Sequence, residues 1–142
     1  MSTIRPETIA AGLRGGAGSG ALWLDVSGDS MGRTIVPGEA VLLRPAPRPR
    51  AGEVWAFCDA RSRIVVHRSR GGRDDAWRFE GDDVGVADPA VPTAWLIGRV
   101  TAVRGPGGEV RRLGRGDRTW GRTRLMARRA RRLLRRTLHR PA

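Results

Sequence analysis

This sequence predicts a mainly β domain, for three reasons. The chain has 142 residues, which is the size of one domain with a modest core. Its 20 Gly and 9 Pro favour short strands joined by turns over long helices. Its apolar residues fall in short runs that are bounded by polar or glycine-containing turns.

The strand-like runs can be placed in chain order. The first leads into a serine-containing turn near residue 30, and a second short run follows that turn. Residues 45–49 (PAPRP) cannot donate ladder hydrogen bonds at their prolines, so we expect an extended surface loop there. We expect strands at residues 21–26, 40–43, 53–58, 64–67, 77–80 and 95–103.

The positive charge is concentrated at the C-terminus. The net charge is +13, and all 27 basic residues are arginine. Residues 1–117 are close to neutral, whereas residues 118–142 contain ten arginines and no acidic residue. On a helix, these arginines occupy one face and the apolar residues the other. We therefore expect an arginine-rich amphipathic helical tail over residues 114–142, after a flexible N-terminal segment at 1–20 and a domain at 21–113.

Three roles for this tail remain open. Its apolar face could pack on the domain, leaving a solvated arginine face. It could instead lie on an anionic membrane surface. It could also bind nucleic acid phosphates or an acidic protein partner through residues 118–140. The arginines that we expect to contact membrane or phosphate are Arg128, Arg131, Arg132 and Arg135.

Other features of the composition exclude several classes of protein. A single cysteine, Cys58, cannot form an internal disulfide, and no Cys and His residues stand at zinc spacing, so we expect no metal and no cofactor. No run of about 18 apolar residues occurs, so we expect neither a secretory signal nor a transmembrane segment. We expect a cytoplasmic location, including a peripheral one on the inner membrane face.

A serine, a histidine and an aspartate are the candidates for chemistry. Ser30 lies in a Gly-Asp-Ser turn after an apolar run, His67 ends the run 64–66, and Asp88 follows the Gly81-Asp82 turn. Each residue alone is more typical of a turn, a packed ring or a loop cap. Together they provide the nucleophile, the base and the orienting carboxylate that acyl transfer to serine requires.

The order and spacing of five short motifs give a more specific prediction. These are residues 26–31 (VSGDSM) continuing to 37–42 (PGEAVL), then 51–57 (AGEVWAF), 64–68 (IVVHR), 79–83 (FEGDD) with Asp88, and 96–100 (LIGRV). Residues 26–103 therefore resemble the S24/S26 peptidase superfamily, which contains the type I signal peptidases and the LexA-like and UmuD-like self-cleaving proteins. The resemblance implies the β fold of that superfamily. Most of its members activate the serine with lysine, but His67-Arg68 is similar to the branch that uses histidine in a His-Arg pair.

The resemblance also implies roles for individual residues. Ser30 would be the nucleophile and its backbone N–H the oxyanion donor, His67 the general base, and Asp88, six residues after Asp82, the orienting carboxylate. Gly28, Met31, Gly81 and Asp82 would be structural at the site. The implied function is a serine endopeptidase that processes a protein or peptide precursor, in the manner of leader removal or maturation.

Three alternatives remain open. The first is a LexA-like or UmuD-like protein that cleaves itself, with Ala11-Gly12 and Ala17-Gly18 as candidate bonds. The second is a catalytically inactive peptidase-fold module that binds nucleic acid or an anionic membrane through its arginine helix. The third is a Gly-Asp-Ser-type esterase, although the chain lacks the later Asp-x-x-His segment of such enzymes.

Overall fold

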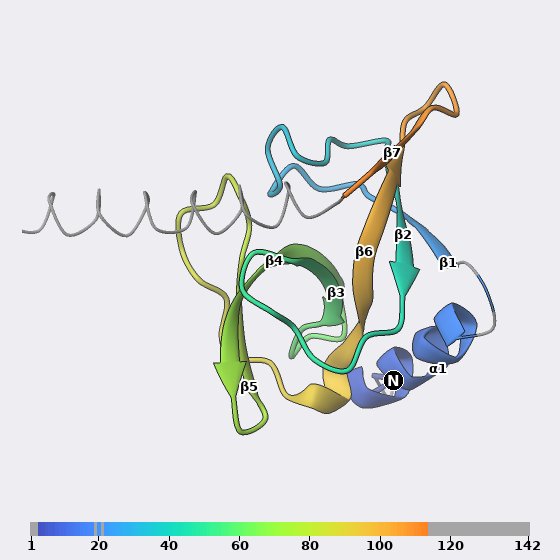
Figure 1. The fold of residues 1–142 in the computed structure, drawn as a ribbon. Coiled ribbons are helices and arrows are strands. Elements are labelled where there is room, and N and C mark those ends of the chain that lie inside the picture. The colour runs from blue at the N-terminus through green and yellow to red at the C-terminus, as the bar shows by residue number, and fades with distance from the viewer. Residues whose placement is uncertain (1–2, 19, 21, 114–142) are drawn as a thin grey trace, which may run out of the picture.

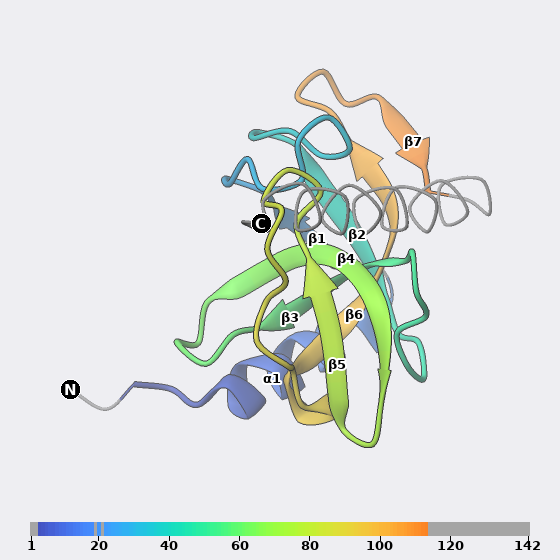
Figure 2. The same ribbon diagram turned by 90° about the vertical axis from the view of Figure 1, so that its left-hand side faces the viewer.

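The computed structural model describes residues 3–18, 20 and 22–113 as a mainly β structure, as the sequence predicts. In this described part, seven strands form a single sheet, and every strand pair in it is antiparallel. Among the described residues, one α-helix and one short 3-10 helix accompany the strands (Figures 1 and 2). The elements are α1 (Pro6–Gly18), β1 (Leu22–Asp25), β2 (Ala40–Arg44), β3 (Val54–Cys58), β4 (Ile64–Arg73), β5 (Ala76–Glu80), η1 (Thr93–Trp95), β6 (Leu96–Arg104) and β7 (Val110–Arg112).

The sheet has the order β1-β2-β6-β3-β4-β5, and β7 pairs with β6. β3 is buried along its whole length, and its alternating side chains enter two separate cores. Val54, Ala56 and Cys58 belong to the first core, which lies against α1. Trp55 and Phe57 belong to the second, which contains the aromatic residues of β5. Because both faces of β3 are buried, its sequence is apolar throughout and does not alternate between apolar and polar residues.

The N-terminal segment differs from our expectation. We expected residues 1–20 to be flexible, but residues 6–18 form α1, and Ala10 and Ala17 on it are buried. Figure 1 shows α1 in blue beside the end of β6 that adjoins η1. The Arg14 guanidinium fixes this position by donating hydrogen bonds to the backbone carbonyls of Ala94 and Leu96, at 3.1 and 2.6 Å. Tertiary contacts therefore stabilise a helix whose glycine content alone disfavours it.

β4 extends further than we expected, beyond His67 to Arg73. It forms a hairpin with β5, with a bulge between Ser69 and Gly71. Asp74 and Asp75 form the turn, and both have positive φ, 51° and 62°. Two consecutive residues in the left-handed conformation are typical of a tight hairpin turn, and aspartate tolerates this conformation better than most residues do.

The predicted tail helix, with Arg128, Arg131, Arg132 and Arg135, lies outside the described residues. Among the residues that are described, no helix is both long and apolar enough to cross a membrane.

Candidate active site

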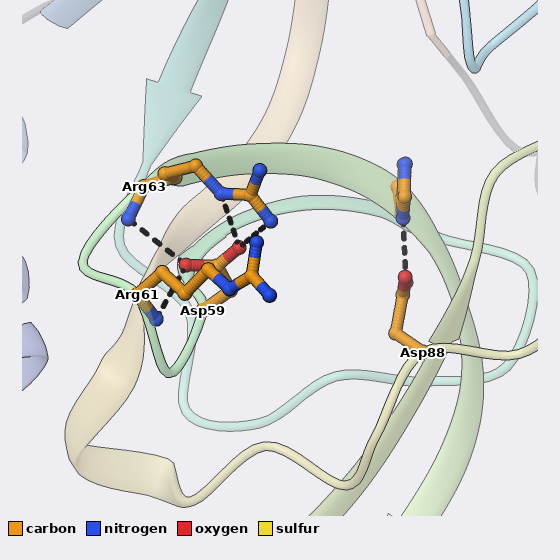
Figure 3. A network of polar contacts seen from close by, with 5 residues as sticks. Asp59, Arg61, Arg63 and Asp88 are labelled. Carbon is orange, nitrogen blue, oxygen red and sulfur yellow. Dashed lines mark hydrogen bonds and ion pairs between the residues drawn. The ribbon is translucent and has the colours of Figure 1, made fainter.

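Ser30, His67 and Asp88 come together in the structure although they lie in three separate segments. The Ser30 hydroxyl is 2.9 Å from Nε2 of His67. On the other side of the ring, Nδ1 of His67 is 2.5 Å from the Asp88 carboxylate; Figure 3 shows Asp88 and this contact. An ionised carboxylate only accepts hydrogen bonds, so it places the ring proton on Nδ1 and leaves Nε2 to accept from the serine. This is the arrangement in which a histidine can remove the proton of a serine hydroxyl.

Ser30 lies in the loop between β1 and β2, and a series of turns fixes its backbone. The Gly32 N–H donates to the Asp29 carbonyl at 3.0 Å. Gly32 has a φ of 56°, the left-handed conformation that favours glycine at such a turn. The next residue, Met31, is 1 % exposed and anchors the loop in the first core. Within the described residues, the backbone N–H of Ser30 donates to no protein acceptor, so it is available to an oxyanion.

His67 is held by the strand that carries it and by aromatic neighbours. It pairs with Trp55 of β3 and is only 7 % exposed. The edge contact of its ring with Phe57 has a centroid separation of 6.2 Å, and Phe57 in turn stacks on Phe79 at 4.4 Å. A ring packed in this way keeps one orientation, so both of its nitrogens stay aimed at their partners.

Asp88 lies on the loop that follows β5. Its backbone N–H donates to the Phe79 carbonyl at 2.8 Å, and Ala87 forms a bridge with Glu80. The loop therefore folds back along β5 and brings the Asp88 carboxylate to the imidazole. The side chain of Asp88 remains 24 % exposed, whereas that of His67 is 9 % exposed.

Gly81 and Asp82 join these segments. The N–H of Asp83, the next residue, donates to the Ser30 carbonyl at 2.9 Å. A Cβ at Gly81 would lie 2.7 Å from that same carbonyl oxygen and 3.1 Å from Nε2 of His67. Only a glycine fits there without displacing its neighbours. By contrast, a Cβ at Gly28 would meet nothing within 4 Å, so packing does not require glycine at that position.

A buried ion pair between Arg68 and Asp82 supports the site, and the sequence motifs predict no role for Arg68 or for Thr34, which also contacts Asp82. Arg68, next to His67, is 2 % exposed and donates two hydrogen bonds to the Asp82 carboxylate, each of 2.8 Å. A third bond runs from Arg68 to the Gly52 carbonyl, and the Thr34 hydroxyl donates to Asp82. The sequence contains one signal for this ion pair, which is the His-Arg pair itself. Consecutive strand residues point to opposite faces, so Arg68 faces away from His67, and an arginine that is buried there requires an acidic partner.

The three residues open onto a cleft of about 900 Å³. β1 and the first part of β4 both contribute to its lining. Of the strands that the structure describes, β1 is the last on its side of the sheet. Within the described residues, β4 pairs with β5 only from Arg68 onward, so residues 64–67 carry no strand on that edge. Free strand edges beside a cleft can pair with an extended peptide.

No group of three or more His, Cys, Asp or Glu side chains in the described part of the chain is arranged to hold a metal ion. Searches against known protein families find no match to this chain, and no curated protein matches it either.

Proposed function

We propose that this protein is a serine endopeptidase that cleaves an extended segment of a protein or peptide precursor. The observation that carries the proposal is the continuous contact from the Asp88 carboxylate through both nitrogens of His67 to the Ser30 hydroxyl, at 2.5 and 2.9 Å. The cleft and the free strand edges beside it favour a peptide over a small ester as the substrate. The resemblance of residues 26–103 to the S24/S26 superfamily implies the same activity.

The steps follow from the atoms at the site. His67 Nε2 accepts the hydroxyl proton while the Ser30 oxygen attacks the peptide carbonyl, and the negative charge develops on the carbonyl oxygen. The backbone N–H of Ser30 stabilises that charge, and Asp88 stabilises the imidazolium. The imidazolium then protonates the leaving amine, and an ester to Ser30 remains. Water, deprotonated by the same Nε2, hydrolyses this ester and regenerates the serine.

Self-cleavage at the Ala-Gly bonds is less well supported than cleavage of a separate substrate. Both Ala11-Gly12 and Ala17-Gly18 lie within α1, and Ala17 is buried. A helical segment uses its own backbone hydrogen bonds and cannot pair with a strand edge. Either bond could reach Ser30 only after α1 had unfolded and left the first core.

The esterase alternative lacks support from the fold. An α/β hydrolase requires a largely parallel sheet covered by helices, whereas the strands described here pair only in antiparallel fashion.

Cleavage of a mixture-based peptide library, followed by mass spectrometry, tests the proposal. We expect the wild-type protein to cut a subset of peptides and Ser30→Ala to lose about 10⁴-fold or more of the rate. Ser27→Ala is the matched control, since Ser27 lines the same cleft, whereas the hydroxyl hydrogen-bonded to His67 is that of Ser30. Cleavage that persists in Ser30→Ala, or no cleavage by any variant, would contradict the proposal and favour a binding module.

A further inference from the structure

A cluster of charged residues lies at a second place in the cleft, on the turn between β3 and β4. Asp59, Arg61 and Arg63 all line the cleft there. Figure 3 shows these three residues together on the turn and Asp88 apart from them. The mechanism above uses none of the three.

The Asp59 carboxylate is ionised and its hydrogen-bonding capacity is occupied. Partial burial by itself raises the pKa of Asp59. Three effects outweigh it and hold the pKa below its usual 3.8: hydrogen bonds from the backbone and side chain of Arg63, a hydrogen bond from the backbone of Arg61, and the positive charge of Arg63. Both backbone N–H groups donate to Oδ1 at 2.9 Å. The Arg63 guanidinium binds Oδ2 at 2.9 Å through Nε and Nη2. Asp59 therefore orders the turn and compensates one of the two arginines.

The Arg61 guanidinium is the uncompensated charge of this cluster. Arg61 is exposed, and within the described residues its side chain makes no hydrogen bond or ion pair, since only its backbone N–H binds Asp59. The cluster consequently has a net charge of about +1 on the cleft wall. The other charged residues of the lining are Asp25 on β1 and the His67–Asp88 pair, so positive charge in the described cleft gathers at this turn.

The position of the cluster along β4 relates it to the site of cleavage. Arg63 directly precedes β4 and is four residues before His67. At a rise of about 3.3 Å per residue, this separation is about 13 Å. A peptide that pairs with the free edge of residues 64–67 advances at the same rate. A substrate residue about four positions from the scissile bond would thus lie beside Arg61 and Arg63.

We infer that Arg61 and Arg63 form a subsite that selects an acidic side chain of the substrate, about four residues from the bond that is cut. This inference rests on the proposed peptidase function and names its substrate class, which is a precursor with Asp or Glu at that distance. Guanidinium groups suit this role because their planar donors match a carboxylate. Asp59 acts as a positioning residue that holds Arg63 in place.

A peptide series tests this inference. Starting from any peptide that is cut in a Ser30-dependent way, Glu and Gln are compared at each position from two to six residues on both sides of the scissile bond. The peptides have amidated C-termini, and one matched set keeps the free acid to separate a terminal carboxylate from an acidic side chain. We expect one position about four residues away to favour Glu over Gln by about fivefold in kcat/KM, the size of an exposed ion pair. Added salt should reduce this preference.

Variants then assign the preference to the cluster. Arg61→Ala should remove most of the preference for Glu over Gln, and Arg61→Glu should reverse it. Arg73→Ala is the matched control, because Arg73 is an exposed arginine at the far end of β4 and does not line the cleft. Normal cleavage with no Glu preference at any position, or a preference that survives Arg61→Ala, would overturn the inference and leave the peptidase function intact.

Binding provides a second readout that does not depend on turnover. Fluorescent Glu and Gln peptides are titrated with Ser30→Ala and with Ser30→Ala/Arg61→Ala, and anisotropy reports affinity. If Ser30→Ala binds Glu peptides more tightly than Gln peptides and Ser30→Ala/Arg61→Ala does not, the subsite is supported. This outcome supports the subsite even if the wild-type protein cleaves no peptide, although the lack of cleavage would by itself defeat the proposed function. Equal affinities for Glu and Gln peptides would overturn the subsite.

Discussion

Replacing Gly81 with alanine tests whether the packing between the Ser30 and His67 segments sets the geometry of the site. The added Cβ would lie 2.7 Å from the Ser30 carbonyl oxygen, 2.7 Å from Cγ2 of Val84 and 3.1 Å from Nε2 of His67. Ordinary contacts of a methyl carbon begin at about 3.5 Å. The methyl group must therefore displace its neighbours, and one of them is the backbone of Ser30, the proposed nucleophile.

The expected loss of activity follows from the size of that displacement. Relieving the contact with the Ser30 carbonyl requires a shift of about 0.5–1 Å, and a misplacement of about 1 Å can reduce a rate about 100-fold. Overpacking of this kind costs about 1–3 kcal/mol of stability. Gly81 has no positive φ, so the alanine introduces no additional backbone strain. We expect Gly81→Ala to remain folded and to lose about 100-fold in kcat/KM.

The assay combines Ser30-dependent peptide cleavage with thermal unfolding of the same preparation. Gly15→Ala in α1 is the control, because a Cβ there meets nothing within 4 Å. Alanine should stabilise that exposed helical position by up to about 1 kcal/mol and leave cleavage unchanged. Wild-type activity in a folded Gly81→Ala protein would refute the reasoning, since it would mean that the Ser30 and His67 segments do not depend on this close approach.

Three further predictions concern the charged groups of the domain. Asp82→Asn should lower the free energy of unfolding in urea by about 3 kcal/mol, because it leaves the buried Arg68 charge uncompensated; a change near zero would contradict this. The hydrogen bond and charge of Arg111 hold the pKa of Glu39 below 4.5 against the effect of burial, so this pair stabilises the fold at neutral pH and its contribution is lost as the pH falls below about 4.5. Glu39→Gln should thus be less stable than wild type at pH 7 but similar to it at about pH 2, and an equal deficit at both would disprove the linkage. Asp88→Asn should slow peptide cleavage about 10⁴-fold without unfolding the domain, by favouring the wrong tautomer of the base; near wild-type cleavage would remove Asp88 from the site.

The sequence predicts most of the strands because each is a short apolar run with a clear end. β2, β3, β5 and β6 begin and end within one residue of the predicted positions. It does not predict α1, since four glycines in thirteen residues give a low helix propensity. The helix depends on burial of Ala10 and Ala17 and on the hydrogen bonds of Arg14, which exist only once the sheet has formed. The short β7, whose residues are all exposed, also lacks a pattern that sequence reasoning can detect.

The sequence likewise predicts some residues of the candidate site and not others. Ser30, His67 and Asp88 could be named because they occur in recognisable motifs, and the structure brings them into contact. The contacts of Arg68 and Thr34 with Asp82 span 14 and 48 residues of sequence. Such pairs depend on which face of each segment is buried, and a single sequence does not specify that.

The central claim is that His67 activates Ser30, and phosphonylation measures this activation most directly. Wild-type protein, Ser30→Ala, Ser27→Ala and His67→Ala are each incubated with a fluorophosphonate at neutral pH and then examined by intact mass and peptide mapping. We predict one adduct, on Ser30, in the wild-type and Ser27→Ala proteins and none in the other two. The absence of an adduct in wild type, an adduct that forms equally in His67→Ala, or one located on Ser27 would contradict the account.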